Sequence, residues 1–197
     1  MPIFLTTENL NEAVRALKDG KVIVFPTETM YGIGCDPENV AAAARISAIK
    51  NRPASLNFNM IARDKKMAME WGTMEPHAEQ ISDKHWPGPL TIILHNAKKT
   101  LASECLRGNA VGVRVSDHPF MLALTAAFGK PIIATSANVH GGPSAYSIPE
   151  VLEQFKKNGV EPDIYFDGGE LPPCAPSMVV EIVNGELVVH RQGSFKL

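Results

Sequence analysis

Two stretches of the chain place hydroxyl groups and glycines directly after an apolar run. The first is Pro26-Thr27-Glu28-Thr29-Met30-Tyr31-Gly32, which follows the apolar residues 22–25. Proline cannot donate a hydrogen bond to a sheet, so Pro26 is expected to end a strand here. Many α/β proteins bind ligands in polar, glycine-containing loops at the ends of strands. The stretch is therefore either a ligand site or an ordinary polar turn.

The second stretch covers residues 135–144 and begins Thr135-Ser136-Ala137-Asn138, with Gly141 and Gly142 close behind. Hydroxyl groups and backbone N–H donors in such a loop suit phosphate oxygens. The glycine–lysine pattern of nucleotide hydrolases is absent, and so is the dinucleotide-binding fingerprint. The loop thus predicts contact with an oxyanion but no particular class of nucleotide.

Three basic residues also stand at the ends of, or within, predicted regular elements. Lys50 and Arg52 stand two residues apart, where Pro53 ends a predicted helix, and Arg114 lies inside the apolar run 111–115. The first pair either complements a helix dipole or clamps a phosphate or carboxylate, since a guanidinium binds oxyanions bidentately and an ammonium acts as a point charge. Arg114 either faces solvent or reaches into a site. The residues alone leave both questions open.

Regular elements must hold these groups in place. Apolar periodicity predicts helices over residues 9–19, 37–49, 65–71, 75–85, 119–128 and 148–158, and strands over 21–25, 58–62, 90–95, 111–115 and 130–134. Residues 165–169 are expected to form a turn, and 177–183 and 186–190 a hairpin around Asn184-Gly185. This irregular alternation predicts one α/β domain over residues 1–197, with a twisted, mixed and partly antiparallel sheet flanked by helices.

The amino-acid composition argues against several classes of protein. With 45% hydrophobic residues and a formal net charge of −2, the chain is not a globally basic nucleic-acid binder, although a local basic patch stays open. The three cysteines are far apart, and the histidines show no ligand spacing, so neither a disulfide framework nor a tightly bound metal is expected. No apolar run approaches the roughly 18 residues of a membrane span. A reducing, cytoplasmic location without membrane contact is therefore predicted.

Taken together, these stretches resemble the YrdC/Sua5 family of threonylcarbamoyl-AMP synthases, in its short, single-domain form. The matching segments follow the family's order and cover nearly the whole chain. They are Pro26–Gly32, Lys50–Pro53, Trp86–Thr91, Gly112–Val115, Ser136–Asn138, Pro176–Val180 and Arg191–Gly193. Each segment alone is weak, whereas the ordered set is specific.

The resemblance implies a YrdC-like fold, in which a twisted α/β sheet encloses a large concave, positively lined cavity. It also implies a nucleotidyltransferase that converts L-threonine, bicarbonate and ATP, the latter with Mg²⁺, into threonylcarbamoyl-adenylate and pyrophosphate. In the family, a downstream tRNA threonylcarbamoyl transferase complex uses the adenylate to modify adenosine 37 of tRNAs. Binding of tRNA or double-stranded RNA is described for some members.

Site residues follow from the same resemblance. Those expected to contact threonine are Thr29, Tyr31, Arg114, Ser136 and Ser177. Those expected to contact ATP are Lys50, Arg52, Asn138 and Arg191, and the first two of these are expected to be catalytic through charge stabilisation. Glu28 has no assigned role. It is expected to orient a neighbouring cation or the loop backbone, because a carboxylate facing ATP would repel it.

Several positions depart from the family pattern. Where the family continues with Asn-Pro-Leu, this chain has Ala54–Met60, with Asn57 one position displaced. A histidine expected near Ile61 in some members is missing, Ala110 stands where a hydroxyl residue commonly precedes the Gly-Val-Arg strand, and Tyr146 replaces a common threonine. The altered segment is similar to YciO-like paralogues, which leaves a nucleotide-binding paralogue without synthase activity as one alternative and an RNA-binding module as another. The retained Lys-x-Arg and Ser-Ala-Asn signatures favour the synthase.

Overall fold

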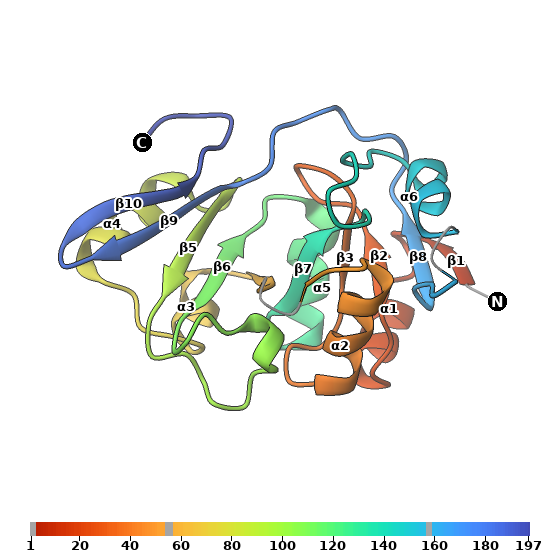
Figure 1. Ribbon diagram of the computed structural model, residues 1–197, viewed down its shortest axis with the longest axis horizontal. Helices are drawn as coiled ribbons and strands as arrows, with labels where there is room; N and C mark the ends of the chain where they lie inside the picture. The colour runs from red at the N-terminus through yellow and green to blue at the C-terminus, as the bar shows by residue number, and fades with distance from the viewer. Residues whose placement is uncertain (1–2, 54–56, 157–158) are drawn as a thin grey trace.

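One continuous sheet organises the protein. The computed structural model describes residues 3–53, 57–156 and 159–197, and within them ten strands are hydrogen-bonded in the order β1-β8-β2-β3-β7-β4-β6-β5-β9-β10. The strands are β1 (Ile3–Thr6), β2 (Ile23–Phe25), β3 (Gly32–Gly34), β4 (Asn59–Ala62), β5 (Leu90–Leu94), β6 (Val111–Val115), β7 (Ile132–Ser136), β8 (Ile164–Asp167), β9 (Met178–Val183) and β10 (Glu186–Arg191). Figure 1 shows β1 and the β9–β10 hairpin at opposite ends of the molecule.

The sheet is mixed, as the sequence predicts. Strands β1 and β2 pair in parallel with β8, β4 with β6, and β5 with β9, while the remaining neighbours are antiparallel. The flanking helices are α1 (Leu10–Lys18), α2 (Val40–Ile49), α3 (Lys65–Met69), α4 (Pro76–His85), α5 (Pro119–Phe128) and α6 (Ile148–Phe155), with a short 3₁₀ turn η1 (Ser103–Cys105). No helix in the described part of the chain is long and apolar enough to cross a membrane.

Alternating side chains divide the core between the two faces of the sheet. On β2, Ile23 and Phe25 pack with α1 and α5, whereas Val24 joins the cluster formed with α2 and α6. The cluster formed with α2 and α6 also includes buried residues of α3 and α4 and the inward residues of β5, β6 and β9. Helices therefore cover one face along its length, while α1 and α5 are the helices whose buried residues form the cluster on the opposite face. Beyond α5, that opposite face of β4, β6, β5 and β9 lines a cavity.

Most predicted elements are confirmed, with shifted ends. Helix α2 begins at Val40 rather than residue 37, because the Asn39 side chain accepts a hydrogen bond from Ala42 N and caps it there. The predicted hairpin is present, and Asn184 and Gly185 both take the positive φ of its turn. The last predicted residues of the helix ending at Asn158, and Ala54-Ser55-Leu56 of the altered segment, lie outside the described residues.

The predicted turn over residues 165–169 is wrong. Residues Ile164–Asp167 form β8, which is sandwiched between β1 and β2. Edge strand β1 and strand β3 are also additions to the prediction, and β7 continues through Thr135 and Ser136, which were expected in a loop. Strand β3 is Gly-Ile-Gly, and a Cβ on Gly34 would lie 1.8 Å from the Ile133 carbonyl oxygen. Close approach of two backbones, rather than β propensity, explains this strand.

Candidate active site

The cavity has a volume of about 530 Å³ and lies over the uncovered face of the sheet. Predominantly polar side chains line it, from the loops after β2 and β7, from strands β4, β5 and β6, and from the region around β9 and β10. All of the predicted site residues except Lys50 contribute to its wall, namely Thr29, Tyr31, Arg52, Arg114, Ser136, Asn138, Ser177 and Arg191. The two loops that the sequence analysis singled out therefore meet at one site.

A single row of paired residues across the sheet builds the cavity floor. Ile61 of β4 pairs with Arg114 of β6, which pairs with Thr91 of β5; Thr91 pairs with Val179 of β9, and this with Arg191 of β10. Paired residues of neighbouring strands point to the same face. The register thus brings Arg114 and Arg191, 77 residues apart in the sequence, to one surface.

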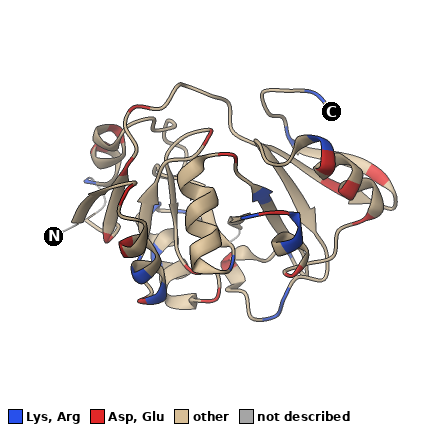
Figure 2. Cartoon of the chain, turned by 180° about the vertical axis from the view of Figure 1, so that it is seen from behind, with Lys and Arg blue, Asp and Glu red and all other residues tan. Residues whose placement is uncertain are grey.

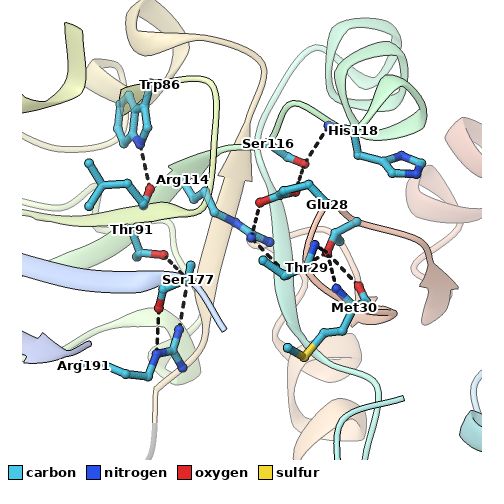
Figure 3. A network of polar contacts seen from close by, with 12 residues as sticks. Glu28, Thr29, Met30, Trp86, Thr91, Arg114, Ser116, His118, Ser177 and Arg191 are labelled. Atoms are coloured by element: carbon cyan, nitrogen blue, oxygen red, sulfur yellow. Dashed lines mark hydrogen bonds and ion pairs between the residues drawn. The ribbon is translucent and has the colours of Figure 1, made fainter. Parts of the chain in front are cut away.

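The loop after β2 is held by its own hydroxyl groups. Thr27 Oγ1 accepts hydrogen bonds from Thr29 N (3.2 Å) and Met30 N (3.3 Å) and donates to the Met30 carbonyl oxygen (2.7 Å). Its distance to Thr29 Oγ1 is 3.1 Å, and both threonines are buried. This is a side-chain-stabilised turn that needs no regular structure. Thr29 lines the cavity, and Figure 3 shows it beside Arg114.

Arg114 forms an ion pair with Glu28. Its Nη1 donates to Glu28 Oε1, and it lies 3.4 Å from Thr29 Oγ1. The other carboxylate oxygen accepts from Ser116 Oγ, which in turn accepts from His118 N at 3.2 Å. The side chains of Arg114 and Glu28 are only 9% and 11% exposed. Glu28 therefore orients a neighbouring cation, and Figure 3 shows the connected network.

A second polar cluster joins the start of β9 to β5 and β10. Arg191 donates from Nε to the Ser177 carbonyl oxygen and from Nη2 to Ser177 Oγ, both at 2.9 Å. Ser177 Oγ is also 2.9 Å from Thr91 Oγ1 (Figure 3). Arg191 consequently has a defined orientation, although within the described residues no carboxylate pairs with it. Burial and the charges of Arg114, Arg107 and Arg52 lower the pKa of Arg191.

Lys50 lies beneath the loop after β7 and does not line the cavity. Its side chain is 1% exposed, and Nζ donates to the carbonyl oxygens of Ser136 and Asn138 (2.7 Å for the latter) and to Asn138 Oδ1 (3.1 Å). Asn138 Oδ1 also accepts from Ser136 Oγ at 2.5 Å, and its Nδ2 donates to the Gly142 carbonyl oxygen at 2.7 Å. Burial and the charge of Arg52 lower the pKa of Lys50 to about 7. The ammonium shapes the loop that carries Ser136 and Asn138.

Arg52 reaches the cavity from the end of α2. Its guanidinium stacks 5.2 Å from the centre of the Phe58 ring, and its Nη2 donates to the Asn57 carbonyl oxygen at 3.0 Å. Asn57, the displaced asparagine, donates to the Leu106 carbonyl oxygen. Burial, followed by the charge of Arg107, lowers the pKa of Arg52. Arg52 therefore presents a guanidinium to the cavity, and Asn57 and Phe58 of the altered segment contact it.

Tyr31 contributes to the cavity wall, but its hydroxyl is occupied elsewhere. The residue is 0% exposed, and its hydroxyl donates to the Gly169 carbonyl oxygen (2.7 Å) and accepts from Gly168 N (2.9 Å). Burial is the largest cause of the rise in the Tyr31 pKa to about 12. Tyr31 thus ties the first loop to the segment after β8.

Asn59, Thr91 and Arg107 are among the wall residues that sequence reasoning missed. Asn59 Oδ1 is buried without a hydrogen-bond partner among the described residues, and it lies 2.2 Å from where a Cβ on Gly112 would stand. Thr91 could have been found from strand alternation, since it is the polar residue of an otherwise apolar strand. Arg107 has no such signal, because it lies in an irregular turn.

In the described part of the chain no cluster of three histidine, cysteine or acidic side chains is arranged to bind a metal ion. The donors that face the cavity are guanidiniums, hydroxyls and amides, which suit anions.

The chain is similar in sequence and in fold to known proteins. Residues 15–193 match the family Sua5_yciO_yrdC, described as telomere recombination. Threonylcarbamoyl-AMP synthase of Aliivibrio fischeri is 37% identical, over 94% of this chain and all of that protein. The structure of P. abyssi Sua5 with L-threonine has a TM-score of 0.86 at 29% identity, over 98% of this chain and 57% of that one. E. coli YciO has the same TM-score at 28% identity, over 100% of this chain and 98% of that one. The chain therefore belongs to the Sua5/YciO/YrdC family.

Proposed function

We propose that the protein is an L-threonylcarbamoyladenylate synthase, a nucleotidyltransferase that makes threonylcarbamoyl-AMP and pyrophosphate from L-threonine, bicarbonate and ATP. The observation that carries this proposal is the cross-strand row that places Arg114 and Arg191 in one cavity. The cavity volume of about 530 Å³ lies within the range of small-molecule sites, roughly 300–1,000 Å³. Curated relatives at 35–40% identity carry the same activity in their names, which favours the synthase over a YciO-like paralogue.

Threonine is assigned to the end formed by Thr29, Arg114 and Ser136. Glu28 occupies one edge of the Arg114 guanidinium, so the remaining N–H groups are available for the threonine carboxylate. Thr29, Ser136 and Ser177 supply hydroxyls for the polar groups of the amino acid. Tyr31 would act here as a wall, because its own hydroxyl is occupied.

ATP is assigned to the end that holds Arg52, Asn138 and Arg191. Guanidinium groups pair with phosphate oxygens bidentately and in a fixed geometry. Lys50 is a positioning residue in this proposal, since its ammonium binds the loop carbonyls rather than facing the cavity. Its role in this proposal is to hold the loop that carries Ser136 and Asn138 in place for the nucleotide.

The reaction follows from this placement. The threonine amine and bicarbonate form a carbamate with loss of water. A carbamate oxygen then attacks the α-phosphorus of ATP, a new P–O bond forms, and the bond to the β-phosphate breaks with its electron pair leaving on pyrophosphate. Mg²⁺ bound to ATP would neutralise part of the phosphate charge. The protein's own contribution is positioning and charge stabilisation, which need no acid–base side chain.

The proposal extends to the fate of the product and to the location of the protein. The adenylate would pass to a tRNA threonylcarbamoyl transferase complex that modifies adenosine 37 of tRNA, in a cytoplasmic setting that suits the three free cysteines. Direct RNA binding stays a prediction. Figure 2 shows Lys and Arg positions interspersed with Asp and Glu positions along the described chain.

The test is pyrophosphate release by the purified protein. Release is expected only when threonine, bicarbonate and Mg-ATP are all present, and ATP turnover that ignores threonine would contradict the proposal. Arg52→Ala or Ser136→Ala is expected to lower the turnover rate by about a hundredfold or more while the protein stays folded in a thermal melt. Ser103→Ala, which removes an exposed hydroxyl outside the cavity, is the matched control.

A further inference from the structure

Arg107 is a cavity residue that no sequence motif pointed to. Its backbone is fixed in a tight turn: Arg107 N donates to the Ala110 carbonyl oxygen at 2.8 Å, and Ala110 N donates back at 3.1 Å. The preceding Leu106 carbonyl oxygen accepts from the Asn57 amide. The side chain is exposed and lines the cavity. Within the described residues, no hydrogen bond or ion pair engages it.

Arg107 is close enough to two other cavity arginines to affect them. After burial, its charge is the next cause that lowers the pKa of Arg52. It also contributes, after burial and the charge of Arg114, to the lowered pKa of Arg191. Three guanidinium groups thus face one space and repel one another. No carboxylate is among the described residues that line the cavity, and Glu28, which lies beside it, is already bonded to Arg114 and Ser116.

A convergence of cations is unfavourable unless an anion of matching charge occupies the space. One carboxylate could pair with one guanidinium, but it would leave the other two unbalanced. A chain of linked phosphates carries several negative charges a few ångströms apart, and each phosphate can accept from a guanidinium fork. Arg191 is already oriented by its two bonds to Ser177, so the site is partly preorganised.

We propose that Arg107 binds the β- and γ-phosphates of the nucleotide together with Arg191 and Arg52, and so holds the pyrophosphate that leaves. This inference rests on the proposed function and adds a residue to it. When the bond from the α-phosphorus to the bridging oxygen breaks, the electron pair moves to the pyrophosphate. Arg107 stands where that charge accumulates. Stabilising a developing charge with a preoriented donor lowers the barrier to the reaction.

Binding of inorganic tripolyphosphate, measured by titration calorimetry without threonine, tests the proposal. Arg107→Ala is expected to raise the Kd for tripolyphosphate about tenfold or more, because charge-assisted hydrogen bonds are lost. The Kd for AMP, which lacks the two outer phosphates, is expected to stay within about twofold. Arg15→Ala is the matched control, since it removes an exposed arginine of α1 outside the cavity.

Three results would overturn the assignment. The first is that the unmodified protein does not bind tripolyphosphate at low salt. The others are that Arg15→Ala weakens tripolyphosphate binding as much as Arg107→Ala does, or that Arg107→Ala weakens AMP binding as much as tripolyphosphate binding. Arg107→Lys keeps the positive charge but removes the bidentate guanidinium. Its Kd for tripolyphosphate is expected to lie between those of the unmodified protein and Arg107→Ala. A thermal melt checks that each variant is folded. Since no turnover is measured, the binding result is independent of whether the protein is a synthase.

Discussion

Replacing Glu28 by alanine is expected to lower the free energy of unfolding by about 3 kcal/mol, because it leaves a buried guanidinium without its counter-charge. The Arg114 and Glu28 side chains are 9% and 11% exposed, so water compensates little of the loss. Ser116 Oγ would lose its acceptor in the same variant. The remaining contact of Arg114 Nη1, 3.4 Å from Thr29 Oγ1, is too long to replace the ion pair.

Urea unfolding at neutral pH measures this difference. Glu28→Gln keeps an acceptor for Arg114 but removes the charge, and it is expected to lose about half as much stability, because charged hydrogen bonds are roughly twice as strong as neutral ones. Glu12→Ala is the control: it breaks the Arg15 pair, whose side chains are 69% and 45% exposed, and is expected to cost under about 1 kcal/mol.

Function gives a second measurement for the same variant. If Glu28 positions Arg114 for the threonine carboxylate, Glu28→Gln is expected to raise the KM for threonine far more than the KM for ATP. A purely structural role would change both alike. The reasoning is refuted if Glu28→Ala costs no more stability than Glu12→Ala, because the pair would then contribute as little as a solvated one.

Three further predictions concern neighbouring contacts. Gly112→Ala is expected to cost about 1–3 kcal/mol in urea unfolding, since its Cβ would stand 2.2 Å from Asn59 Oδ1; an unchanged midpoint would contradict the packing. Ser177→Ala frees Arg191 from one of its two bonds and is expected to weaken tripolyphosphate binding by calorimetry, whereas unchanged binding would show that this bond does not orient the arginine. The pKa of Lys50 is lowered from 10.5 to about 7, so between these values the unfolded chain binds more protons and the free energy of unfolding from this group rises with pH. Lys50→Met should flatten that rise between pH 7 and pH 9 in urea unfolding, and parallel profiles would refute the assignment.

The amino-acid sequence by itself determined the elements that have strong local signals. The Asn184-Gly185 turn, the helices with regular apolar spacing and the strands of β4, β5 and β6 follow from nearest-neighbour preferences. It also located both polar loops of the site, because a strand that ends in hydroxyls and glycines is visible in the residues alone. The ordered set of motifs then indicated the family.

Only the tertiary structure decided which groups meet. Strand β8 begins with the β-favouring residues Ile164, Tyr165 and Phe166, but it is only four residues long and runs into Gly168 and Gly169, and β1 and β2 supply its hydrogen bonds on both sides. Glu28 is hydrogen-bonded to Arg114, which lies 86 residues further along the chain. Lys50 binds the Ser136 carbonyl oxygen, also 86 residues away, and does not face the cavity. Arg107 reaches the site from an irregular turn. Such contacts depend on register and chain reversal over long separations, which local propensity does not encode.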